Sequence, residues 1–210
     1  AASDVYKRQL HIEQARVFLE HGKHVICEKP LSAHAKDVAE LQALAKERGL
    51  IYLEAIMFMH LPQRKLLEEA LKKIGDISVA KIDFCQRSSK YDAYLAGSLP
   101  NIFNPALETG ALMDLGVYCV YPALYLFGKP QNTLAVSHLL ASGADGSDIV
   151  AMQYPDKLVN LVFSKVGQAG ANTDFQGTNG TVSVESISKL ANISIPVSYT
   201  HLTLPTICSV

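Results

Sequence analysis

The segment His24-Val-Ile-Cys-Glu-Lys-Pro30 decides the fold of this 210-residue chain, because it is a short apolar strand that stops at a charged turn. A short, uninterrupted apolar run is typical of a strand that is buried on both faces of a parallel sheet. Pro30 restricts Lys29 to extended geometry and disfavours a helix at this point. The pattern therefore places a lysine at the carboxyl end of a strand, where open α/β sheets bind ligands.

Helical and strand patterns alternate on both sides of this segment. Residues 10–22 are expected to form a helix that ends at Gly22 and carries Ile12, Ala15, Phe18 and Leu19 on one face. A second helix is expected from Ser32, as its N-cap, to about Arg48. Residues 50–56 form the next apolar strand. This order, with short connections, predicts a parallel, doubly wound sheet. Since two parallel strands are not a stable unit, we expect the first half of this domain, with any glycine-rich phosphate loop, to be missing.

The pattern changes after residue 61. A helix is expected from Pro62 to about Lys73, and the almost uniformly apolar residues 109–127 predict a buried helix. Strands are expected at 77–87, 132–141, 148–154, 158–166 and 190–195, with a hairpin at 173–185. The Asn179-Gly180 dipeptide favours a type I′ turn in that hairpin. Successive strands with short turns predict an open, mostly antiparallel sheet that helices cover on one face.

The two ends of the chain depart from the patterns beside them. Residues 1–9 (AASDVYKRQ) and 196–210 (PVSYTHLTLPTICSV) resemble translated sequencing-adapter sequence. We expect both to be non-native terminal segments that pack poorly on the core, and we exclude them from the fold prediction.

Composition argues against several classes of function. The chain is 49% hydrophobic and 19% charged, which is enough to bury a sizeable core. The formal net charge of −1 gives no reason to expect nucleic acid or an anionic membrane as a partner. No apolar run approaches the roughly 20 residues that span a bilayer.

The four cysteines lack CxxC spacing, which favours free thiols in a reducing, cytoplasmic compartment. His21 and His24 have no neighbouring ligands, so no metal site is expected.

A second motif, Gly110-Ala-Leu-Met-Asp114-Leu-Gly116-Val-Tyr118, carries two polar side chains at i and i+4 of the expected helix, and hence on one face. Asp114 is a lone carboxylate in an apolar setting and requires a partner, which Lys29 could supply. A lysine, a carboxylate and a phenol that converge on one cleft form a proton-handling set. The structural alternatives are a carboxylate that caps backbone amides and a core tyrosine.

Together, the EKP motif at residues 28–30 and the GALMDLGVY motif at 110–118 resemble the glucose–fructose oxidoreductase / inositol dehydrogenase (Gfo/Idh/MocA) family of nicotinamide-dependent oxidoreductases. The nearest resemblance is to its dihydrodiol-dehydrogenase-like branch, which has Tyr rather than His at the last position of the second motif. The resemblance covers about residues 10–190. It implies an α/β fold, with the C-terminal half of a Rossmann parallel sheet over residues 10–60. An α/β domain with an open, mostly antiparallel sheet follows over residues 61–195.

The resemblance also implies a catalytic set of Lys29, Asp114 and Tyr118. Lys29 would position or protonate the substrate oxygen, and Tyr118 could exchange a proton with that oxygen if Lys29 lowers its pKa. Either residue is compatible with the role of proton carrier. Gly116 lies between Asp114 and Tyr118, where a side chain could block the approach of the ring or the substrate.

The implied cofactor is NAD or NADP. By the same resemblance, the residues beside the bound nicotinamide are His11, Glu28, Lys29 and Pro30. Glu54 and His60 flank a segment that resembles the one passing under the nicotinamide, where an ordinary structural role is equally compatible.

For the parent protein, the resemblance implies hydride transfer to or from the carbinol carbon of a sugar, cyclitol or dihydrodiol. The expected partners are a small-molecule polyol, sugar or diol and a second copy of the chain, bound through the C-terminal sheet. The 210 residues alone are expected to be inactive, because the phosphate-binding half is expected to be absent. Two alternatives remain: a non-catalytic nicotinamide-binding sensor or regulatory protein, and an inert fragment that self-associates.

Overall fold

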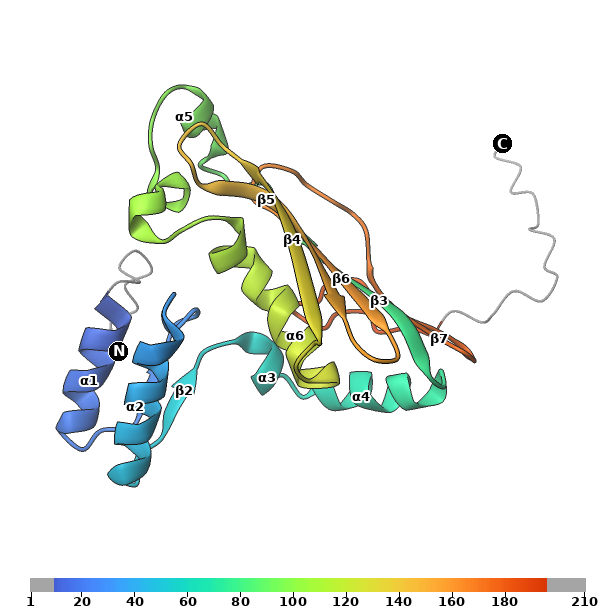
Figure 1. The fold of residues 1–210 in the computed structure, drawn as a ribbon, viewed down its shortest axis with the longest axis horizontal. Helices are drawn as coiled ribbons and strands as arrows, with labels where there is room; N and C mark the ends of the chain where they lie inside the picture. Colours follow the sequence, from blue (N-terminus) through green and yellow to red (C-terminus); the bar gives the residue numbers. More distant parts are fainter. Residues whose placement is uncertain (1–9, 196–210) are drawn as a thin grey trace, which may run out of the picture.

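A computed structural model describes residues 10–195 of the chain, as two units joined by the segment that follows β2 (Figure 1). The first unit contains a two-stranded parallel sheet, and the second contains a six-stranded sheet. This arrangement confirms the predicted α/β class, a parallel sheet followed by a mostly antiparallel one. The predictions for residues 1–9 and 196–210 lie outside the described residues.

The first unit alternates helices and strands as predicted. Its elements are α1 (His11–Glu20), β1 (Val25–Cys27), α2 (Ala35–Glu47) and β2 (Tyr52–Glu54). β1 pairs in parallel with β2, with Cys27 opposite Glu54. Its small core contains Ala15, Leu19, Val25, Leu41 and Ala45.

Two local predictions for this unit are wrong. Phe18 does not share the buried face of α1, since its exposed fraction is 54%. Ser32 is not the N-cap of α2, because that helix begins at Ala35 and follows His34. The Ser32 hydroxyl instead accepts a hydrogen bond from the backbone N–H of His34 at 3.0 Å.

The second unit places its helices before and between the strands. The helices are α3 (Met57–His60), α4 (Gln63–Lys73), α5 (Tyr91–Leu95), the 3₁₀ turns η2 (Asn101–Phe103) and η3 (Pro105–Leu107), the π-helical turn η4 (Leu112–Gly116) and α6 (Val117–Phe127). The strands are β3 (Ile77–Cys85), β4 (Asn132–Leu139), β5 (Asp145–Gln153), β6 (Leu158–Ser164), β7 (Thr173–Gly177) and β8 (Gly180–Val184). Residues 190–195 do not form the predicted strand: Ser194 makes an isolated bridge to Ser183 of β8, and Ala191 makes one to Ser186.

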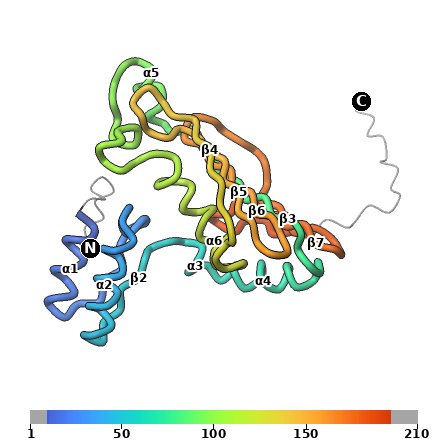
Figure 2. The backbone as a smooth tube through the Cα atoms, in the orientation of Figure 1, coloured from blue at the N-terminus to red at the C-terminus, as the bar shows by residue number. Residues whose placement is uncertain are grey.

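The six strands are ordered β4-β5-β6-β3-β7-β8. β3 runs parallel to β6, and the other neighbouring pairs are antiparallel. Strand β5 shows that one face of the sheet is buried and the other is exposed. Val150 and Met152 are buried with residues of α4 and α6, whereas Ile149 is exposed. The tube in Figure 2 follows the chain from β2 into the helices that share this core and then into the strands.

The apolar stretch at 109–127 differs from the uniform buried helix that was predicted. It is a π-helical turn followed by an α-helix, and Leu112 and Leu124 remain 43% exposed. By length and composition alone, Pro105–Phe127 would suffice to cross a membrane, with 23 residues and a mean hydropathy of 1.4, contrary to the sequence-based expectation. In the fold, however, α6 and η4 pack on β3 and β6 and belong to the core.

The hairpin turn between β7 and β8 also differs from its prediction. Gly177 pairs with Gly180, so Thr178 and Asn179 are the central residues of the turn. Neither has a positive φ, which excludes a type I′ turn. A Cβ at Gly177 would lie 2.3 Å from the carbonyl oxygen of Ile74, so glycine is required where the hairpin meets the end of α4.

Candidate active site

Lys29 lies immediately beyond the carboxyl end of β1, as the sequence predicts. The adjoining loop is held from two sides. The ring N–H at Nδ1 of His11 donates to the carbonyl of Pro30 at 3.1 Å, and the backbone N–H of Leu31 donates to Oε1 of Glu54 at 3.1 Å. The Lys29–Pro30 peptide bond is cis. These contacts direct the lysine side chain, which is only 14% exposed, towards the second unit.

Asp114 comes from the π-helical turn η4 and meets Lys29 across the two units. The Lys29 Nζ atom donates to Oδ1 of Asp114 at 2.9 Å and to the Asp114 backbone carbonyl at 2.6 Å. π-Helical turns occur frequently at functional sites, because the extra residue alters the direction of the helix face. The structure therefore brings together a lysine and a carboxylate that are 85 residues apart in the sequence.

A second lysine, which sequence reasoning missed, completes the cluster. Lys165 follows β6, and its Nζ lies 2.7 Å from Oδ2 of Asp114. Lys165 is buried, with 9% of its surface exposed. The signal that could have revealed it is the pattern that identifies Lys29: a lysine directly after an apolar strand.

The electrostatics of the cluster keep Asp114 charged. Burial disfavours the carboxylate, but the positive charges and hydrogen bonds of Lys29 and Lys165 outweigh this effect and lower the pKa of Asp114 below its ordinary value. Each carboxylate oxygen has its own ammonium partner. Asp114 is therefore an ion-pair acceptor and not a backbone cap.

Tyr118 joins the cluster through its ring. The Lys29 Nζ atom lies 4.7 Å from the ring centroid, within the range of a cation–π contact, and Phe84 packs edge-on against the same ring at 5.5 Å. Burial, together with the negative charges of Asp114 and Glu28, raises the pKa of the Tyr118 hydroxyl. The condition under which Tyr118 could exchange a proton, a pKa lowered by Lys29, is therefore not met, and the raised pKa favours the protonated hydroxyl.

Gly116 serves packing and not access to the site. A Cβ at this position would lie 2.8 Å from two ring atoms of Phe163 on β6. The glycine therefore allows η4 to approach the sheet closely, which brings Asp114 to Lys165. The expectation that it leaves space for the ring or the substrate is not supported.

The other predicted residues divide into two groups. His11 and Pro30 lie with Lys29 at the strand end, whereas Glu28 is exposed. The His60 ring donates from Nε2 to the backbone carbonyl of Glu54 at 3.0 Å, which gives it a structural contact. Among residues 10–195, no group of three or more His, Cys, Asp or Glu side chains could hold a metal ion.

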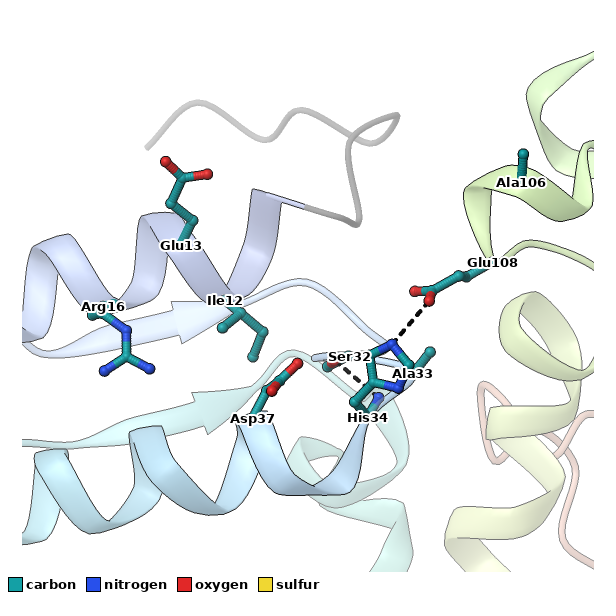
Figure 3. Close-up of a pocket in the computed structure, with 9 residues that line it drawn as sticks. All are labelled: Ile12, Glu13, Arg16, Ser32, Ala33, His34, Asp37, Ala106 and Glu108. Atoms are coloured by element: carbon teal, nitrogen blue, oxygen red, sulfur yellow. Dashed lines mark hydrogen bonds and ion pairs between the residues drawn. The ribbon is translucent and has the colours of Figure 1, made fainter.

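A separate cavity of about 480 Å³ lies between the N-terminal ends of α1 and α2 and the 105–108 segment (Figure 3). His34 spans it by a polar contact, with Nε2 lying 3.0 Å from Oε1 of Glu108. Lys29 and Asp114 do not line this cavity. It is therefore distinct from the lysine–carboxylate cluster.

Comparison with known sequences identifies two matched regions. Residues 2–56 match a family described as an oxidoreductase family with an NAD-binding Rossmann fold, and residues 64–183 match the GFO/IDH/MocA C-terminal domain. The chain is 40% identical over 186 residues to scyllo-inositol 2-dehydrogenase (NADP(+)) IolU of Bacillus subtilis, covering 89% of this chain and 57% of the relative. It is 30% identical over 174 residues to trans-1,2-dihydrobenzene-1,2-diol dehydrogenase of Mus musculus, covering 80% and 50%.

Solved structures give the same fold. KijD10, a 3-ketoreductase from Actinomadura kijaniata solved with NADP, superposes with a TM-score of 0.73 at 27% identity, over 85% of this chain and 54% of that one. The WlbA dehydrogenase from Bordetella pertussis reaches a TM-score of 0.75 at 18% identity, over 93% and 58%, which shows the fold alone. The chain spans about half the length of the relatives that it matches.

Proposed function

The chain belongs to the GFO/IDH/MocA oxidoreductase family, and from that premise we propose that the whole protein transfers a hydride between NAD(P) and the carbinol carbon of a sugar, cyclitol or dihydrodiol. One observation carries the proposal: Lys29, at the strand end of the NAD-binding unit, contacts Asp114 from the second unit at 2.9 Å. The boundary between the units near residue 60 stays a prediction.

Lys29 is the proposed proton carrier. Its ammonium group has three N–H donors, and Asp114 accepts two of them, through Oδ1 and its backbone carbonyl. The remaining donor is available for a substrate oxygen. A cation at that oxygen stabilises a developing alkoxide, and in the direction of reduction Lys29 donates the proton that completes the hydroxyl. In the direction of oxidation it takes the same proton back.

Asp114 and Tyr118 support that step. Asp114 orients the Lys29 ammonium and balances its charge, and Lys165 fixes the second carboxylate oxygen. Tyr118 keeps its proton because its pKa is raised, so its hydroxyl is a donor to the substrate and not a base. Between the two proton carriers that the sequence left open, these contacts favour Lys29.

The strand-end residues fit a nicotinamide dinucleotide. The carboxyl ends of β1 and β2 form the kind of edge at which open α/β sheets bind ligands, and Lys29 and His11 both lie there. His11, Lys29 and Pro30 would hold the nicotinamide and its ribose. When bound, the cofactor supplies or accepts the hydride, and the protein contributes orientation and the proton. The name of the Bacillus subtilis relative makes NADP the first cofactor to test.

A second copy of the chain is the proposed protein partner. The outer face of the sheet exposes apolar side chains that a dimer would cover: Leu134, Val136, Leu139, Ile149 and Leu158. An exposed apolar patch of this kind is typical of an interface between proteins. We propose a cytoplasmic homo-oligomer without a nucleic-acid or membrane partner.

A spectrophotometric assay tests the proposed function. The full-length protein is incubated with NADP or NAD and either scyllo-inositol or a trans-dihydrodiol, and formation of reduced nicotinamide is followed. We expect turnover with at least one substrate class. Binding of the dinucleotide without turnover on cyclitols, sugars and diols would instead support a non-catalytic sensor. Self-association without dinucleotide binding would support an inert protein.

A further inference from the structure

The carboxylate of Glu54 is hydrogen-bonded from both units at once. Its Oε1 atom accepts the backbone N–H of Leu31 at 3.1 Å, and its Oε2 atom accepts the hydroxyl of Tyr121 at 2.5 Å. Leu31 belongs to the loop that follows β1, and Tyr121 belongs to α6. One side chain at the end of β2 therefore ties that loop to the helix.

The two tied segments carry the candidate catalytic groups. Leu31 is two residues after Lys29, and Tyr121 is three residues after Tyr118 on the helix that continues from Asp114. Since helical residues three apart are neighbours on one face, Tyr121 lies beside Tyr118. The Glu54 bridge therefore spans the same gap as the contact between Lys29 and Asp114.

We propose that Glu54 and Tyr121 are positioning residues that fix the Lys29 loop against the helix bearing Asp114. The inference rests on the proposed function, because it concerns the geometry of that same site. Neither residue needs to touch the substrate. They act by holding the distance between Lys29 and Asp114 constant.

There is a physical reason why the site needs a second link between the Lys29 loop and the helix that bears Asp114. Lys29 is also the residue that must donate its third N–H to the substrate, so its contact with Asp114 is a poor candidate for the sole link that sets the geometry of the site. A hydrogen bond to a charged carboxylate is stronger than one between neutral groups. The hydroxyl of Tyr121 is held protonated by burial and by the hydrogen bond to Glu54, which raise its pKa. The Tyr121 hydroxyl is therefore held as a donor to Glu54.

A matched pair of tyrosine variants isolates the bridge. Tyr125 lies one turn further along α6, and its hydroxyl donates to Glu68 at 2.8 Å, away from Lys29. Tyr121→Phe and Tyr125→Phe each delete one hydroxyl that is bonded to a glutamate. In the full-length protein we expect Tyr121→Phe to lower kcat about 10-fold, since small displacements of catalytic groups are costly, with the substrate KM within about twofold. For Tyr125→Phe, both kcat and the substrate KM should stay within about twofold of the wild-type values.

Two glutamate variants give a graded series. Glu54→Gln removes the negative charge but can keep both bonds, because its amide oxygen accepts from Leu31 and its amide N–H can donate to the Tyr121 oxygen. Both bonds are then weaker than those to a carboxylate, whereas Glu54→Ala loses both. The expected order of kcat is wild type, then Gln, then Ala. Combining Tyr121→Phe with Glu54→Gln should cost less than the product of the single effects, because both changes act on one bridge.

Hydrogen exchange at the Leu31 amide tests the bridge without any activity. We expect exchange to be at least about fivefold faster in Tyr121→Phe and Glu54→Ala than in wild type, because the loop loses its support. Tyr125→Phe should not change it. Equal Leu31 exchange in all four proteins would overturn the inference, as would equal kcat in Tyr121→Phe and Tyr125→Phe. If the wild type had no turnover but Leu31 exchange responded as expected, the proposed function would fail while the bridge stood.

Discussion

Asp114 is the residue on which the site depends, because its carboxylate is shared between two ammonium groups. Lys29 reaches one oxygen from the first unit, and Lys165 reaches the other from the end of β6. Burial alone would favour the neutral acid, so the low pKa of Asp114 reports how strongly the lysines act on it. Removing the carboxylate leaves two partly buried cations facing each other.

Asp114→Asn should therefore destabilise the protein at neutral pH by about 2 kcal/mol, less than for a fully buried pair because the site is partly exposed. A carboxyl group with a lowered folded pKa contributes stability above its unfolded pKa and loses it as pH falls through the folded pKa. The difference between variant and wild type should therefore shrink from pH 7 to about pH 3. Urea unfolding of the wild type and the variant at both pH values measures this difference in the free energy of unfolding.

The control for that measurement is Asp92→Asn, which removes an exposed carboxylate that pairs with Arg87. It should have no measurable effect on unfolding at pH 7. An Asp114→Asn protein as stable as wild type at pH 7 would show that the ion pairs of Asp114 with the two lysines do not stabilise the fold.

At the scale of elements, the close packing of η4 on β6 positions the site. Gly116 allows this approach, since a Cβ there would overlap the ring of Phe163. The same contact holds Asp114 near Lys165, which directly follows β6. Packing between helix and sheet is thus coupled to the ion pairs.

Gly116→Ala should cost about 1–3 kcal/mol of unfolding free energy, the usual range for an overpacked core. Phe163→Leu in the same chain should relieve part of this cost, so the double variant should be more stable than the sum of the single effects predicts. Chemical denaturation of the three variants and the wild type gives the comparison. Strict additivity would mean that Phe163 is not what Gly116 accommodates.

The elements that the sequence predicted well are those with local signals. The strand predicted from His24 to Cys27 ends at the charged turn that follows it, and the helix predicted after Pro62 ends before Gly75. Both elements occur in the structure, as β1 and α4. The π-helical turn at Asp114 was not predicted, because an apolar stretch does not reveal one extra residue per turn. Lys165 was missed because its role depends on the packing of η4 against β6, which brings together residues that are far apart in the sequence. The β7–β8 turn was misplaced because the close approach of Ile74 to Gly177 sets its register.

At the scale of the whole molecule, the two units meet through polar bridges. Lys29 to Asp114, Glu54 to Tyr121 and His34 to Glu108 each join the first unit to the second. A site assembled from both units responds to their relative position, so we expect changes to these bridges to affect the proposed activity. The outer sheet face takes no part in this contact and is the surface proposed for a second copy.

Val136→Lys should weaken that proposed dimer. Val136 is 66% exposed on β4, which pairs with β5 and is the edge strand of the sheet over the described residues 10–195. A lysine placed in an apolar interface would be desolvated and unpaired, which is costly. Sedimentation of the full-length protein should show a shift towards monomer, whereas Leu95→Lys, at an exposed position on α5, should leave the mass unchanged. A wild-type protein that is monomeric at tens of micromolar would refute the interface.

The most direct test of the central claim is the Lys29→Met substitution in the full-length protein. The claim is that Lys29 handles the proton during hydride transfer, so kcat should fall about 100-fold or more, the scale for losing a general acid or base. Dinucleotide affinity, measured by calorimetry, should change by no more than a few fold. Lys36→Met, at an exposed lysine on α2, is the matched control and should retain turnover. Near-wild-type turnover in Lys29→Met, with an intact fold, would contradict the account.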